Sequence, residues 1–75
     1  MYSITDDQRK RLENDFTYHK PTESQVPRYE SIRARAKDYA EFLMTMCPPS
    51  RELSLALTHL ETAVMFANAA ISRNE

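Results

Sequence analysis

The absence of glycine limits this chain more than any other feature of its sequence. None of the 75 residues is glycine. The Walker and dinucleotide-binding loops need glycine, either for a positive φ angle or for close approach of the backbone to phosphate. Tight β-hairpin turns lose their most common residue for the same reason. We therefore predict an all-α fold, and we exclude the glycine-rich phosphate loops as a basis for function.

Length and cysteine content limit the stability that such a fold can reach. We expect one domain, residues 1–75, with a marginal core, because a chain this short buries only about 60% of the surface exposed by its unfolded form. Cys47 is the only cysteine, so it can form neither an internal disulfide nor a zinc site with spaced partners. Self-association is therefore the remaining way to stabilise a fold with so small a core. The lone thiol and the lack of a membrane span or signal peptide predict a soluble cytoplasmic protein.

Local signals divide the chain into an N-terminal helix (1–15), a proline-containing loop (16–26) and an antiparallel helical hairpin (27–73). Thr5 and Gln8 form a capping-box pattern at the start of the first helix. The motif "CPPS" ends the second helix, and Ser50 can cap the third. Apolar residues at spacings of three and four predict the contact seam of the hairpin. Its members are Tyr29, Ile32, Ala36, Tyr39, Leu43 and Met46 on one helix, and Leu53, Leu57, Leu60, Val64, Ala67 and Ile71 on the other.

The last helix carries more apolar residues than one seam uses. Leu55, Met65, Phe66 and several alanines lie outside the seam, around much of the circumference. A helix that is apolar on all sides is normally buried on all sides. We therefore predict a homo-oligomer with this helix at its centre. The alternative is a three-helix monomer closed by the N-terminal helix.

Catalytic and metal-binding patterns are absent from the sequence. His19 and His59 lie in different predicted elements, and neither has a serine or cysteine at a spacing typical of a nucleophile and its base. The net charge of −1 also lacks the positive field of non-specific nucleic-acid binders. We therefore predict a protein that is not an enzyme, has no cofactor or metal, and binds neither DNA nor membranes.

The stretch "FTYHKPTESQVPRYESIR" concentrates aromatic and basic residues at the entrance of the second helix. Flat side chains beside guanidinium groups can hold a nucleobase by its face while its phosphate is paired. A second arrangement of this kind lies near the end of the chain, where an aromatic residue and an arginine share a helix face. The candidate ligand-binding residues are Tyr18, His19, Lys20, Arg28, Tyr29, Arg33, Phe66, Asn68 and Arg73.

Ordinary structural roles are the alternative for these residues. The tyrosines could belong to the core, and the basic residues could form a solvated face balanced by Glu30, Asp38 and Glu41. Asn68 interrupts an apolar run and needs a partner, which could be its symmetry mate or a ligand. In a ring of hairpins, the two aromatic-basic arrangements could come from different subunits, as one pocket or as two.

A family resemblance rests on an ordered series of segments. "FTYHKP", Gln25, "RYESIRARAK" and "PPSRELSLALTHLETAVMFANAAISRN" together resemble the helical-hairpin domain of phage anti-CBASS and anti-Thoeris sponges. The resemblance covers about residues 16–74. It implies a non-catalytic hexamer that acts in the host cytoplasm. In this family, cyclic di- or trinucleotides or cyclic ADP-ribose isomers are held in pockets between subunits.

Two other functions are compatible with the sequence. One is a phage accessory factor that binds a host protein through its apolar C-terminal helix. The other is a small DNA-binding regulator, which the near-neutral charge and the two-proline connection disfavour.

Overall fold

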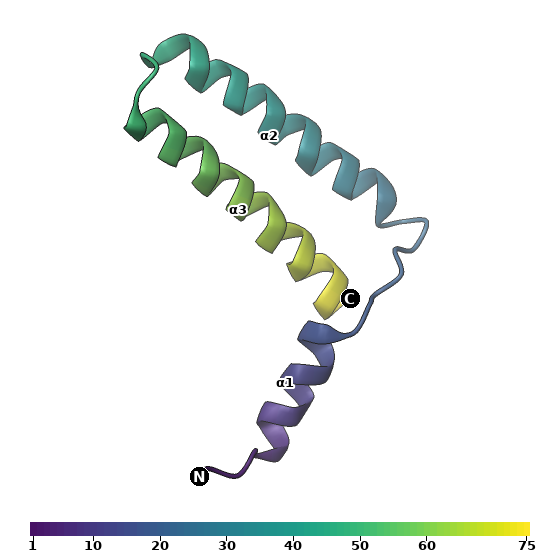
Figure 1. Ribbon diagram of the computed structural model, residues 1–75. Helices are drawn as coiled ribbons and strands as arrows, with labels where there is room; N and C mark the ends of the chain where they lie inside the picture. The colour runs from purple at the N-terminus through teal and green to yellow at the C-terminus, as the bar shows by residue number, and fades with distance from the viewer.

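The computed structural model describes residues 1–75 and contains three helices and no strand. Helix α1 spans Asp6–Phe16, α2 spans Val26–Met46 and α3 spans Arg51–Asn74. The two long helices lie side by side and antiparallel, and α1 projects away from the open end of this hairpin (Figure 1). The prediction of an all-α chain with a helical hairpin is confirmed.

Local capping determines where α1 begins. Thr5 Oγ1 accepts a hydrogen bond from the Gln8 amide at 3.1 Å, and the Thr5 amide donates to Gln8 Oε1 at 3.0 Å. This is the reciprocal capping box that the sequence predicts. No residue of α1 is buried, and Leu12 and Phe16 are exposed. Because side-chain packing contributes so little, α1 depends on polar contacts at its two ends.

The hairpin is held by a seam of partly buried apolar residues. On α3 the predicted seam residues are all partly buried except Ile71, which is buried. On α2 the prediction is wrong for Tyr39 and Met46, which are 53% and 67% exposed. The next residue along is partly buried in each case, namely Ala40 and Cys47.

Side-chain size explains this difference on α2. A helix turns about 100° per residue, so both Tyr39 and Ala40 lie about one turn beyond Ala36 and both fit the apolar spacing. The small Ala40 allows the two helices to approach, and Tyr39 instead contacts Phe42 at a ring-centroid distance of 6.0 Å. The seam of α2 therefore follows the smaller residue.

A single hairpin leaves this protein with almost no core. Ile71 and Gln25 are the only buried residues, and the molecule measures 49 × 39 × 13 Å, the thickness of one helical layer. Met65 and Phe66 on α3 are 64% and 68% exposed. Because α1 points away from the hairpin (Figure 1), the chain does not form the three-helix monomer that we considered. None of its helices is long and apolar enough to cross a membrane.

Candidate functional site

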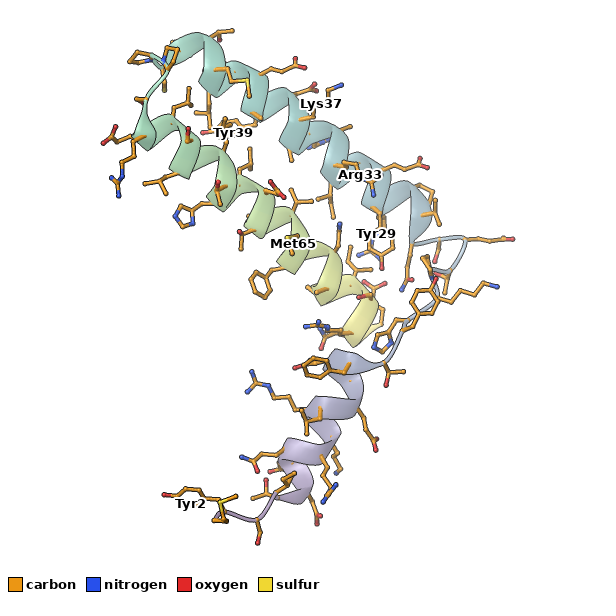
Figure 2. All side chains as sticks on the ribbon, viewed as in Figure 1. Tyr2, Tyr29, Arg33, Lys37, Tyr39 and Met65 are labelled. Atoms are coloured by element: carbon orange, nitrogen blue, oxygen red, sulfur yellow. The ribbon has the colours of Figure 1, made fainter.

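The end of α1, the following loop, the start of α2 and the end of α3 meet at the open end of the hairpin. They surround an open pocket of about 430 Å³, which we name the end pocket. Because α2 and α3 are antiparallel, the first turns of α2 lie opposite the last turns of α3. Figure 2 shows Tyr29 between α2 and the end of α3, with Arg33 one turn further along α2. The pocket is lined by Asp15, Thr17, Tyr18, His19, Tyr29, Arg33, Asn68, Ala69, Ser72 and Arg73.

Most of the predicted ligand-binding residues meet here within one chain. Those in the end pocket are Tyr18, His19, Tyr29, Arg33, Asn68 and Arg73. Lys20 and Arg28 lie outside it. Phe66 lines a neighbouring hollow of about 280 Å³, the Phe66 hollow, which shares Asp15, Ala69 and Arg73 with the end pocket. The two aromatic-basic arrangements of the sequence are therefore adjacent in a single chain, and their roles in binding remain predictions.

Arg28 is engaged elsewhere, in a salt bridge to the end of the chain. Its Nη1 atom lies 2.7 Å from Glu75 Oε1, so the pair ties the first turn of α2 to the end of α3. This hydrogen bond is the main reason why the pKa of Glu75 lies below its ordinary value and the pKa of Arg28 lies above its own. Arg28 thus helps to close the hairpin beside the pocket.

His19 and Arg73 hold the C-terminal end of α1 at the pocket. The last carbonyl groups of a helix have no partner within the helix. His19 Nε2–H donates to the Asn14 carbonyl at 2.8 Å, and Arg73 Nη2 donates to the Asp15 carbonyl at 3.4 Å. Both residues therefore have a structural role in addition to any contact with a ligand.

The charges of the end pocket favour an anion. Arg33 and Arg73 both line it, and Asp15 is the single carboxylate among the lining residues. Arg73 Nη1 lies 3.5 Å from Asp15 Oδ1, whereas Arg33 forms no salt bridge. One guanidinium is thus free to pair with a phosphate, and Tyr18 and Tyr29 lie near it to contact a ring.

Comparison with known families identifies the domain to which this hairpin belongs. The model of the Acb2/Tad1 hairpin domain matches residues 8–72. The chain belongs to the Acb2/Tad1 hairpin-domain family. This is the anti-CBASS and anti-Thoeris sponge family of phages, so the resemblance noted in the sequence is confirmed. The curated proteins and the solved structures gave no significant match.

Family membership gives this Acb2/Tad1 protein the general role of a cyclic-oligonucleotide sponge. Such proteins sequester their ligands and are not known as enzymes. A sponge needs a site that recognises phosphates and rings without reacting with them. The end pocket brings guanidinium groups, which can recognise phosphates, and tyrosines, which can contact rings, to one end of the hairpin.

Asn68 is the least satisfied polar residue of the Acb2/Tad1 hairpin. Its Oδ1 atom is buried and has no hydrogen-bond partner. An unpaired buried acceptor costs about 1–3 kcal/mol. Asn68 lines the end pocket, so a rotation of its side chain would turn this oxygen toward a donor group on a ligand.

Sequence reasoning missed several residues of the pocket, most importantly Asp15. This residue is the penultimate residue of α1, where the negative end of the helix dipole disfavours a carboxylate. That unfavourable position was a signal in the sequence that Asp15 has a partner outside its helix. Thr17, Ala69 and Ser72 carried no comparable signal.

Proposed function

We propose that this protein binds and sequesters cyclic oligonucleotide second messengers in its end pocket, and so blocks host anti-phage defence. The ligands we propose are cyclic di- or trinucleotides or cyclic ADP-ribose isomers, held without cleavage in the cytoplasm of the infected host. The observation that carries the proposal is the meeting of Arg33, Arg73, Tyr18 and Tyr29 around one pocket.

The chemistry of these side chains matches the parts of a cyclic nucleotide. Arg33 and Arg73 pair with the phosphates, because charge-assisted hydrogen bonds from guanidinium groups are strong and can be bidentate. Tyr18 and Tyr29 contact the base or ribose faces, and each base stack contributes about 1–3 kcal/mol. Asn68 Oδ1 accepts a hydrogen bond from the ligand after a rotation that brings this buried atom into the pocket. Phe66 lies on the other side of Arg73, where a larger ligand would extend.

We further propose a homo-oligomer, a hexamer by analogy with the family. Its support is the large apolar surface that a one-layer hairpin leaves exposed, including Leu55, Met65 and Phe66 on α3. In such an assembly a neighbouring subunit would cover the open side of the end pocket. Lys20 lies outside the pocket of its own chain and would then be available near a subunit boundary, whereas Arg28 would first have to leave Glu75.

The side chains near the pocket support binding without cleavage. His19 is its only histidine, and its Nε2 atom already donates to the Asn14 carbonyl. No group of three or more His, Cys, Asp and Glu side chains is arranged to hold a metal ion. We therefore assign the pocket a holding role and no hydrolytic role.

Native mass spectrometry with a panel of cyclic di- and trinucleotides and cyclic ADP-ribose isomers tests this function. We expect an oligomer that gains mass in whole-ligand steps, and a ligand that is recovered intact after heat denaturation of the complex. Linear or monomeric nucleotide in the recovered material would mean a phosphodiesterase instead of a sponge.

A second candidate function is a helical factor that binds a host protein through α3. The exposed side chains Leu55, Met65 and Phe66 favour it, because exposed large apolar side chains can also bind a partner of another kind. The same experiment separates the two functions. The absence of any mass shift across the whole panel would favour the protein binder.

A further inference from the structure

Asp15 lies between the end pocket and the Phe66 hollow and is part of the lining of both. Its carboxylate contacts two arginines: Oδ1 lies 3.5 Å from Arg73 Nη1, and Oδ2 lies 3.5 Å from Arg11 Nε. Its carbonyl oxygen accepts a second bond from Arg73, at 3.4 Å from Nη2. Asp15 thus engages the guanidinium of Arg73 through both its side chain and its backbone.

This contact is also what attaches α1 to the rest of the molecule. No other hydrogen bond or salt bridge joins α1 to α2 or α3. The bond from His19 to the Asn14 carbonyl stays within α1 and the loop that follows it. Because no residue of α1 is buried, packing cannot replace the contact between Asp15 and Arg73.

The local stability of α1 does not explain why an aspartate occupies this position. A carboxylate in the last turn of a helix is disfavoured by the helix dipole, and α1 has no basic residue in that turn. Arg11 and Asp15 are four residues apart, but the acidic residue comes second, which is the less favourable order. The contact with Arg73 is the remaining stabilising interaction of Asp15.

We propose that Asp15 is an internal competitor for the anion site at Arg73. This inference rests on the proposed function, in which the same guanidinium pairs with a ligand phosphate. A carboxylate and a phosphate oxygen bind a guanidinium fork in the same way, so both cannot use the same donors at once. A phosphate that binds Arg73 therefore displaces Asp15 and releases the end of α1. Ligand binding and α1 docking oppose each other through a single side chain, and this linkage is reciprocal.

The size of the effect follows from the exposure of the pair. The side chains of Arg73 and Asp15 are 36% and 29% exposed, so solvent weakens their attraction. Removal of the carboxylate should therefore strengthen ligand binding only modestly, by about two- to fivefold.

The test compares Asp15→Asn with the matched control Glu13→Gln. Glu13 lies on the same helix, loses the same charge, and neither lines a pocket nor forms a salt bridge. The first measurement is the rate of tryptic cleavage within α1, at Arg9, Lys10 and Arg11, without ligand. We expect Asp15→Asn to be cleaved several times faster than the control. Purely local effects largely cancel, because loss of a carboxylate from the last turn stabilises the helix, whereas loss of the exposed contact with Arg11 slightly destabilises it.

The second measurement is calorimetric titration with cyclic di-AMP and cyclic tri-AMP. We expect Asp15→Asn to bind whichever nucleotide the wild-type protein binds with a Kd about two- to fivefold lower, and Glu13→Gln to match the wild type. Saturating nucleotide should also accelerate cleavage of the wild-type α1, and should accelerate cleavage of Asp15→Asn less, because only the bond from Arg73 to the backbone carbonyl is left to displace. Asp15→Ala should repeat both results, which excludes a new contact made by asparagine.

The possible failures are distinguishable. Wild-type binding with no gain in Asp15→Asn would overturn the competition and leave the proposed function intact. Weaker binding by Asp15→Asn would mean that Asp15 itself contacts the ligand, which also overturns the inference. If no variant binds either nucleotide or any other member of the panel, the proposed function fails and the competition fails with it.

Discussion

The two arginines of the end pocket differ in what they contact before any ligand arrives. Arg33 is without a salt bridge, whereas Arg73 is held by Asp15. Arg33 can bind a phosphate without breaking an existing salt bridge. Arg73 must first lose its contact with the Asp15 carboxylate. Arg33 is therefore the residue on which initial capture of the ligand should depend most.

Arg33→Ala and Arg73→Ala should each weaken binding of the same cyclic nucleotide. Loss of a hydrogen bond to a charged group costs about 1.5–3 kcal/mol, which corresponds to about 10- to 150-fold in Kd. Calorimetric titration measures the loss, and Arg35→Ala is the control, because Arg35 is an exposed arginine on the same helix outside the pocket. If each variant lost a different ligand, the arginines would serve two sites. Full retention by both would place the site elsewhere.

Replacement of Asn68 by leucine should weaken ligand binding without lowering the stability of the fold. The change removes a buried acceptor that has no partner, so we expect the free energy of unfolding to rise by about 1 kcal/mol or to stay the same. Ligand binding should weaken, because a donor on the ligand loses its acceptor. Chemical denaturation and titration of the same sample provide both numbers. A clear loss of stability would show that Asn68 is satisfied within the protein or its assembly.

At the scale of the helices, the hairpin is joined at its open end by one ion pair. Arg28 at the start of α2 and Glu75 after α3 are joined at 2.7 Å, on the side of the hairpin opposite the "CPPS" connection. The rest of the contact between α2 and α3 is a seam of partly buried side chains. Because that seam is thin, the ends of the helices are sensitive to their polar contacts.

The Arg28–Glu75 pair should make the last turn of α3 sensitive to acid. The pKa of Glu75 is lowered from 4.5, chiefly by the hydrogen bond from Arg28. A group whose pKa is lowered on folding stabilises the fold above its unfolded pKa, and this contribution disappears as the pH falls through the folded value. We therefore expect the pair to be fully formed at neutral pH and to be lost progressively as the pH falls below about 4.5.

Nuclear magnetic resonance titration of the Glu75 carboxylate measures this directly. In Arg28→Gln the pKa of Glu75 should move up toward its ordinary value, and the amides of the last turn of α3 should lose their pH dependence. Glu52, an exposed carboxylate in the first turn of α3, is an internal reference in the same spectra. An identical Glu75 titration in both proteins would contradict the role of Arg28.

The whole molecule is a single layer of helices with its large apolar side chains on the outside. Its thickness of 13 Å leaves no interior apart from the seam, and Phe42, Met65 and Phe66 are all more than half exposed. A monomer would leave these large apolar side chains in contact with water, and exposed apolar surface often marks an interaction site. Association with further copies is the simplest way to cover it.

Ala70→Glu should dissociate the proposed oligomer without unfolding the hairpin. Ala70 is exposed in the single chain, so a glutamate there is tolerated by α2 and α3 and is costly only in a close-packed interface between subunits. Light scattering after size-exclusion chromatography should show the mass of a monomer, with unchanged helical circular dichroism. Glu41→Lys, which lies on the exposed face of α2, should keep the wild-type mass. An intact oligomer in Ala70→Glu would mean that this face of α3 is not the interface. Ala67→Glu is less informative, because Ala67 also lies in the seam of the hairpin.

The sequence by itself determined the features that depend on neighbouring residues. The capping box of Thr5 and Gln8, the break at "CPPS" and the seam of α3 were all predicted, because each depends on dihedral preferences and spacings within a few turns. The same local rules failed on α2, where Tyr39 and Ala40 both fit the apolar spacing and only the approach of α3 selects the smaller one.

The tertiary structure alone decided which of the candidate residues meet. Tyr29 and Asn68 are far apart in the chain and come together because α2 and α3 are antiparallel, whereas Arg28 is withdrawn from the pocket by Glu75. The contact between Asp15 and Arg73 joins residues 58 positions apart and depends on the direction in which α1 leaves the hairpin. No spacing rule encodes such a pair, because the distance between its two side chains is set by how whole helices pack and not by the residues between them.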